Sequence, residues 1–186
     1  MAYRTKTYIA GDWTGDSDAI ETLYKWKNSG YLNFDFVDAH SLTQARDSSL
    51  NCSIKRSLKE RLDASKTFVL IVGANTKDLR AGGCQYCNNY RSYAYSSRCL
   101  HNYSLDFRSY IDYECEKAKE AGIRIVVLYN YANVYSDKCP ESLRCIGSHV
   151  AMISNGRWDY SSIKKAIEGF KRSNGHKNLK LRIKAV

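Results

Sequence analysis

Two kinds of hydrophobic pattern alternate along the chain. Short, almost entirely apolar runs indicate buried strands, and segments in which apolar residues recur every three or four positions indicate amphipathic helices. The expected strands are residues 5–10, 33–37, 67–72, 124–129 and 149–154. The expected helices are residues 18–27, 53–64, 110–121 and 160–170. This order predicts a three-layer α/β domain, in which a five-stranded parallel sheet has helices on both faces.

Length and composition fit one globular domain. The chain has 186 residues, of which 44% are apolar and 26% are charged, values close to those of globular proteins. We expect a single domain over residues 1–172, with an inserted loop at about 74–109. A basic tail, residues 173–186, follows it and contributes to the net charge of +10. Such a tail is either a solvated terminus or an arm that binds nucleic acid.

No apolar run approaches the roughly 20 residues that a membrane-spanning helix needs. No secretory signal is visible at the N-terminus, so we expect a cytoplasmic protein without a membrane partner. The seven cysteines are odd in number and scattered, which favours free thiols over a disulfide framework.

The site is expected where strands of a parallel sheet end, because ligands of such sheets bind at the carboxyl edge. The segments concerned are residues 11–17, 38–47, 73–109 and 130–140. They contain neither a dinucleotide-binding glycine fingerprint nor a phosphate-binding loop. A nucleophile elbow is absent as well, and no aspartate directly follows the third strand, which disfavours a phosphorelay receiver.

Glu114 is the most informative polar position. On a helical wheel it lies at the margin of the stripe formed by Ile111, Cys115 and Ala118, whereas the other acidic residues of this helix lie on the solvent side. A partly desolvated carboxylate must be paired, shifted in pKa or used in function. An ion pair or cap with a basic neighbour such as Arg108 is the structural alternative to a catalytic role.

The helix that carries Glu114 also resembles a known family. Residues 113–118 (YECEKA) and 122–127 (GIRIVV) resemble the aromatic-Glu-x-x-x-Ala helix and following strand of TIR-like domains. Further similar segments, in the same order, are residues 8–13, 38–41, 54–58 and 68–76. The resemblance covers roughly residues 5–154 and is closest to the ThsB TIR-like proteins of Thoeris antiphage defence.

This resemblance implies a flavodoxin-like fold and cleavage of the nicotinamide–ribose bond of NAD+. Glu114 would be the catalytic carboxylate. The nucleotide-binding residues would be Gly11, Asp12, Trp13, Ser41, Arg46 and Tyr113. NAD+ would be the substrate, with no tightly bound cofactor. The family further implies a cyclic ADP-ribose-type product that activates a separate effector protein. The sequence leaves open whether a phage-derived trigger acts on the protein and whether it assembles into homo-oligomers.

Several of these residues have structural alternatives. Trp13 stacks on a base or nicotinamide ring, or it simply packs. Arg46 meets the pyrophosphate or is a solvated loop charge. Asp12 orders a ribose hydroxyl or caps the first helix.

The inserted loop contains Cys84, Cys87, Cys99 and His101, which could provide four ligands for a structural zinc ion. The pair Cys99 and His101 has a tighter spacing than common zinc sites. Thiols packed among tyrosines are therefore the favoured interpretation. The tyrosines and arginines of this loop are consistent with a lid over NAD+, a base-stacking surface or a contact for a phage component.

Two other functions remain alternatives to an enzyme that cleaves NAD+. The first is a non-catalytic TIR-like module that binds a protein partner. The second, suggested by the charge, is an α/β domain that binds nucleic acid.

Overall fold

The computed structural model describes residues 4–29, 51–77 and 108–169, and all structural statements below concern these residues. Its main sheet has four parallel strands: β1 (Lys6–Ala10), β2 (Ser65–Val72), β3 (Arg124–Tyr129) and β4 (Ser148–Ala151), in the order β1-β2-β3-β4. Four helices accompany them: α1 (Ser17–Asn28), α2 (Asn51–Asp63), α3 (Tyr110–Glu120) and α4 (Tyr160–Glu168). Two short 3-10 helices, η3 (Ser136–Lys138) and η4 (Glu141–Leu143), lie between β3 and β4.

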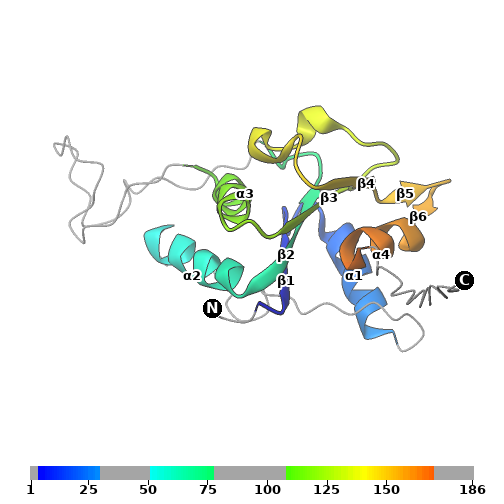
Figure 1. Ribbon diagram of the computed structural model, residues 1–186. Helices are drawn as coiled ribbons and strands as arrows, with labels where there is room; N and C mark the ends of the chain where they lie inside the picture. The colour runs from blue at the N-terminus through cyan, green and yellow to red at the C-terminus, as the bar shows by residue number, and fades with distance from the viewer. Residues whose placement is uncertain (1–3, 30–50, 78–107, 170–186) are drawn as a thin grey trace, which may run out of the picture.

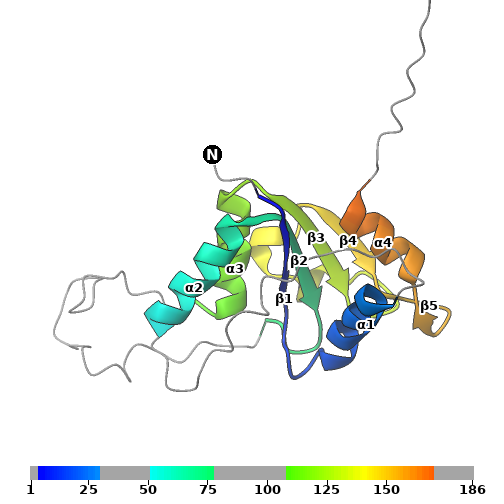
Figure 2. The ribbon, with the colours of Figure 1, turned by 90° about the horizontal axis from the view of Figure 1, so that it is seen from below.

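The helices form a layer on each face of the sheet, which confirms the α/β prediction (Figure 1, Figure 2). One face packs against α2 and α3 and is called here the α2–α3 face; the other packs against α1 and α4 and is called the α1–α4 face. Neighbouring strand residues alternate between them: Tyr8 and Phe68 contribute to the α2–α3 face, and Ile9 and Val69 to the α1–α4 face. Burial on both sides explains why β2 and β3 are almost continuous apolar runs.

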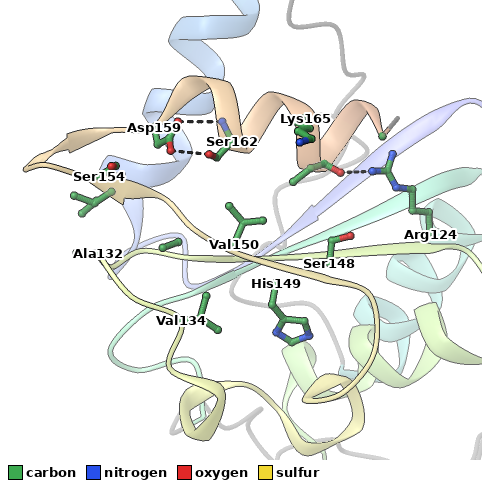
Figure 3. Close-up of a pocket in the computed structure, with 14 residues that line it drawn as sticks. Arg124, Ala132, Val134, Ser148, His149, Val150, Ser154, Asp159, Ser162 and Lys165 are labelled. Carbon is green, nitrogen blue, oxygen red and sulfur yellow. Dashed lines mark hydrogen bonds between the residues drawn. The ribbon is translucent and has the colours of Figure 1, made fainter. Parts of the chain in front are cut away.

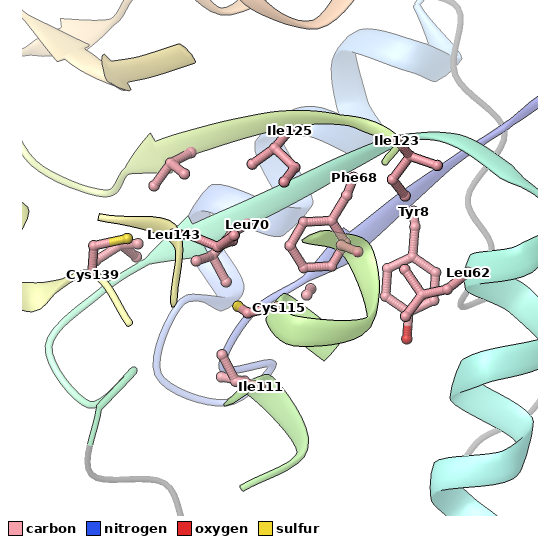
Figure 4. Close-up of a cluster of buried hydrophobic side chains, with 14 of the residues drawn as sticks. Tyr8, Leu62, Phe68, Leu70, Ile111, Cys115, Ile123, Ile125, Cys139 and Leu143 are labelled. Atoms are coloured by element: carbon pink, nitrogen blue, oxygen red, sulfur yellow. The ribbon is translucent and has the colours of Figure 1, made fainter. Parts of the chain in front are cut away.

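The α2–α3 face contains a core of aromatic and aliphatic side chains (Figure 4). Tyr8 and Phe68 stack with ring centroids 5.8 Å apart, and Leu62 from α2 and Cys115 from α3 pack into the same cluster. Cys115 is fully buried. This packing fixes which side of α3 faces the sheet, and therefore the direction in which Glu114 projects.

The sheet prediction is untested in one place and wrong in another. Residues 33–37, the predicted second strand, lie outside the described residues, so the four parallel strands are those of the described ranges and the fifth strand stays a prediction. The predicted strand 149–154 is not one strand, because β4 ends at Ala151 and β5 (Ile153–Ser154) pairs antiparallel with β6 (Arg157–Trp158). Asn155 and Gly156 between them have positive φ values of 50° and 72°, as a two-residue Asn-Gly hairpin turn requires.

The inserted loop lies outside the described residues from 78 to 107, and so does the predicted tail, 173–186. Among the described helices, none is both long and apolar enough to cross a membrane.

Candidate active site

Glu114 lies in the middle of α3. Ser109 caps this helix, because its Oγ accepts a hydrogen bond of 3.0 Å from the backbone N–H of Asp112. The Glu114 side chain points inward and is only 4% exposed. The inward direction expected from the helical wheel is therefore confirmed.

Tyr8 is the hydrogen-bond partner of Glu114. The Tyr8 hydroxyl donates to Oε1 of Glu114, and both groups are buried. Burial raises the pKa of Glu114 from 4.5 to about 7, while the Tyr8 hydrogen bond and the more distant charge of Arg61 oppose this rise. At neutral pH the carboxyl group is thus close to half-ionised, unlike an ordinary glutamate.

The ion-pair alternative for Glu114 is not what the described residues show. Arg108 pairs with Glu116 instead. The other acidic residues of α3 are solvent-facing as predicted: Glu116 and Glu120 have side chains 44% and 58% exposed, and Glu120 pairs with Lys117 at 2.5 Å. Glu114 is therefore the only acid on α3 that is buried against the sheet.

Tyr113, the neighbour of Glu114 on α3, lies among cations. Its ring centroid is 5.3 Å from the Lys55 Nζ, 5.4 Å from the Arg108 Cζ and 5.9 Å from the Lys117 Nζ. Lys55 is buried, and its ammonium group donates to the Arg108 carbonyl at 2.8 Å. This arrangement ties α2 to the start of α3 and places positive charge one residue away from Glu114.

The predicted residues Gly11, Asp12 and Trp13 lie together directly after β1. Asp12 is buried, and its Oδ1 accepts from the Thr14 N–H at 3.0 Å. The N-cap of α1 is Asp16, so the interpretation of Asp12 as the cap of this helix is wrong; Asp12 stabilises the preceding turn. Trp13 is 39% exposed, with its ring 6.4 Å from that of Tyr24.

Asp16 is a polar residue of this edge that the sequence analysis did not single out. It is 2% exposed, and its Oδ1 accepts from Nδ2 of Asn130, after β3, at 3.0 Å. Its Oδ2 is buried and has no hydrogen-bond partner among the described residues. Burial is the largest cause of its raised pKa, and the charges of Asp12 and Asp18 add to it.

Gly73, after β2, completes this arrangement. A Cβ added to Gly73 would lie 1.8 Å from Asp16 Oδ1, so a side chain there would collide with the carboxyl group. Asp16 thus joins the ends of β1, β2 and β3. The sequence pointed to this arrangement only through position, since Asp16, Gly73 and Asn130 all lie in the segments that follow strands.

The remaining predicted residues lie outside the described residues. These are Ser41, Arg46, Cys84, Cys87, Cys99 and His101. Within the described ranges, no three or more His, Cys, Asp or Glu side chains are grouped so that they could hold a metal ion. The described part of the site therefore consists of the Tyr8–Glu114 pair beneath the α2–α3 face and the Asp12–Asp16 turn at the carboxyl edge.

Comparison with known families supports the resemblance seen in the sequence. Residues 7–81 match the family model described as Thoeris protein ThsB, TIR-like domain. The match runs from β1 to just beyond β2 and confirms the predicted resemblance, although it ends before α3 and Glu114. A search of curated proteins gave no match.

Proposed function

Since residues 7–81 match the family model of the ThsB TIR-like domain, we propose that the protein cleaves NAD+ at the nicotinamide–ribose bond in antiphage defence. The product would be a cyclic ADP-ribose-type signal that activates a separate effector protein. The observation that carries this proposal is the inward-facing, buried carboxyl group of Glu114, which accepts a hydrogen bond from the Tyr8 hydroxyl.

The chemistry requires an anion beside a sugar that becomes positively charged. When the bond between the ribose C1′ and the nicotinamide nitrogen breaks, nicotinamide takes the electron pair and leaves as a neutral molecule. The ribose then resembles an oxocarbenium ion until an oxygen attacks it. A carboxylate fixed in a poorly solvated site stabilises this charge more strongly than one in water.

The attacking oxygen determines the product. Attack by water releases ADP-ribose and a proton, whereas attack by a hydroxyl or ring nitrogen of the same nucleotide closes a cyclic product and likewise releases a proton. In either case Glu114 would orient the ribose, and carboxylates of glycoside hydrolases provide the chemical precedent. The family resemblance favours the cyclic product.

The raised pKa of Glu114 fits a cationic substrate. Nicotinamide carries a positive charge in NAD+, and a nearby cation lowers the pKa of a carboxyl group. Binding of NAD+ would therefore shift Glu114 towards its ionised form, and loss of neutral nicotinamide would leave that anion beside the ribose. Tyr8 keeps Oε1 oriented throughout, because its hydroxyl donates to the carboxylate.

The nucleotide would extend from Glu114 towards the carboxyl edge of the sheet. Gly11, Asp12, Trp13 and Tyr113 are our candidates for its binding there, together with Ser41 and Arg46. Lys55, Arg108 and Lys117 around Tyr113 supply the positive charge on this side. Assembly into homo-oligomers and a phage-derived trigger are part of the proposal.

Measurement of nicotinamide release tests this function. The purified chain is incubated with NAD+, with and without extract of phage-infected cells, and compared with Glu114→Gln. The matched control is Glu120→Gln, which changes an exposed carboxylate of the same helix. We expect the control to retain turnover and Glu114→Gln to lose at least about a hundredfold, the order of a single electrostatic catalytic group.

A non-catalytic TIR-like module that binds a protein partner is the second candidate. The observation that favours it is the end of the family match at residue 81, before Glu114. In that case NAD+ remains intact under every condition, and Glu114→Gln leaves partner binding unchanged. Equal turnover by wild type and Glu114→Gln would likewise reject the catalytic role.

A further inference from the structure

The main sheet ends in a strand with an unpaired edge. Within the described ranges, β4 pairs with β3 on one side only. The Met152 N–H donates to the Tyr129 carbonyl at 2.8 Å. In a parallel ladder, successive residues direct their backbone groups to opposite neighbours. The backbone N–H and C=O groups of His149 and Ala151 therefore point away from β3, towards the outer edge.

A groove of about 600 Å³ runs along this edge (Figure 3). Ala132 and Val134 line it from the loop after β3, and Ala166 lines it from α4. Val150 of β4 lies between these two sides, and Val134 is 46% exposed. An unpaired edge beside apolar side chains is a template for one more strand.

The chain itself provides a segment with the pattern of such a strand. Four apolar residues alternate with three basic ones from residue 179 to residue 185. The apolar positions are Leu179, Leu181, Ile183 and Ala185, and the basic positions between them are Lys180, Arg182 and Lys184. Strict alternation over this length is typical of a half-buried strand, since successive side chains point to opposite faces.

The segment between α4 and Leu179 is long enough to reach β4. Gly169, which follows α4, lines the groove, and a Cβ placed on it would lie 2.8 Å from Nη1 of Arg124 at the start of β3. Nine residues, 170–178, separate Gly169 from Leu179 and reach up to about 30 Å when extended. The four residues of β4 span only about 13 Å. The segment can thus reach either end of β4.

The handedness of the fold selects the direction. The β2-α3-β3 crossover passes over the α2–α3 face, whereas α4 packs on the α1–α4 face. A parallel strand outside β4 would continue the strand order in the direction from β2 to β3, but its connection through α4 would pass over the α1–α4 face. That connection would therefore be a left-handed crossover. Such crossovers are rare, which leaves the antiparallel orientation.

We propose that residues 179–185 pair antiparallel with the outer edge of β4 in the same molecule. The apolar residues of this segment then cover the groove beside Val150 and Ala166, and its basic residues form a row on the opposite side. Hydrogen bonds to the outward-facing backbone of His149 and Ala151 fix the strand. This inference is independent of the proposed NAD+ chemistry.

Amide hydrogen exchange of the full chain, followed residue by residue, tests the proposal. The test variant is Leu181→Asn with Ile183→Asn, which removes the apolar face. The matched control is Lys180→Asn with Arg182→Asn, which removes charge and keeps that face. We expect the His149 and Ala151 amides to exchange about tenfold or more faster in the test variant than in wild type, and within about twofold of wild type in the control.

The other outcomes overturn the proposal. Equal exchange of these two amides in wild type and test variant means that the segment does not cover β4. Equal loss of protection in both variants indicates attachment by charge and not by the apolar face. Protection that rises with protein concentration indicates pairing with a second copy. The amides of Val126 and Leu128, inside the sheet, must stay protected in every variant and so report that the fold is intact.

Discussion

Two buried carboxyl groups, Glu114 and Asp16, differ in the way the fold accommodates them. Glu114 receives a hydrogen bond from Tyr8, and its pKa rises to about 7 because the cluster around it excludes water. Asp16 accepts a hydrogen bond from Asn130 with one oxygen, and its other oxygen has no partner within the described part of the chain. Asp12 and Asp18 lie in the same neighbourhood. The first arrangement provides a titrating group at neutral pH, and the second concentrates negative charge at the carboxyl edge.

Replacement of Glu114 by Gln should change stability in a pH-dependent way. Below pH 4.5 the glutamate is protonated in both the folded and unfolded chains, so its charge has no cost. Between pH 4.5 and 7 the unfolded chain ionises first, and above about pH 7 the cost of the buried charge is complete. The rise from 4.5 to about 7 corresponds to about 3 kcal/mol. Glu114→Gln, whose amide oxygen still accepts from Tyr8, should therefore exceed wild type in stability at pH 8 by about this amount.

Urea unfolding at pH 4 and at pH 8 measures this difference. Glu120→Gln, a change on the exposed side of the same helix, should show no comparable difference between the two pH values. A stability gap between wild type and Glu114→Gln that is the same at pH 4 and pH 8 would mean that Glu114 does not titrate as a buried acid.

Tyr8→Phe removes the donor and keeps the ring packed against Phe68. Because the Tyr8 hydrogen bond lowers the pKa of Glu114, its loss should raise that pKa above 7 and move the pH dependence of nicotinamide release upward. Loss of a hydrogen bond to a buried acid should also cost about 1–3 kcal/mol of stability at pH 8. A pH–rate profile and urea unfolding measure the two effects, with Tyr135→Phe as the control because Tyr135 is 40% exposed.

The direction of a side chain could be predicted from the sequence where its element is regular, and could not where the chain is irregular. Glu114 could be placed because α3 is a regular amphipathic helix, whose period fixes the direction of every side chain. Asp16 could not, because it precedes a helix in an irregular turn, and its burial depends on Gly73 and Asn130, which are far away in the sequence. The division of residues 149–154 into β4 and β5 was missed although Asn155-Gly156 is a recognised hairpin turn, since the apolar run Val150–Ile153 resembles one strand.

The close packing of strand ends around Asp16 leads to a prediction for Gly73. Gly73→Ala places a methyl group 1.8 Å from Asp16 Oδ1, so either the buried Asp16 carboxyl group or the turn after β2 must shift, at a cost of about 1–3 kcal/mol. In an Asp16→Ala background the obstructing carboxyl group is absent, and the same change should cost much less. A double-mutant cycle by thermal unfolding measures this coupling, and additive effects of the two changes would contradict the contact.

At the scale of the whole molecule, one face of the sheet is purely structural and the other contains the candidate catalytic residue. The α1–α4 face is apolar packing bordered by the groove at β4, whereas the α2–α3 face contains Glu114 within its core. The layers and helix positions could be predicted because they follow from periodicity. The environment of Glu114 could not, because Tyr8 is 106 residues away in the chain and no local pattern records such a contact.

Thiol reactivity should report the integrity of the α2–α3 face. Cys115 and Cys139 are buried, and burial raises the pKa of both thiols, whereas Cys145 is exposed. Since the thiolate is the reactive form, a disulfide reagent should modify Cys145 rapidly in the native protein. Modification of Cys115 requires opening of the core and should be about a thousandfold slower or more, given a typical unfolding free energy above about 5 kcal/mol.

Peptide mass spectrometry assigns the modified positions, and guanidinium chloride should accelerate Cys115 labelling in parallel with unfolding. Labelling of Cys115 as fast as Cys145 in native buffer would show that α3 opens locally, and Glu114 would then be exposed to water too often to retain its raised pKa.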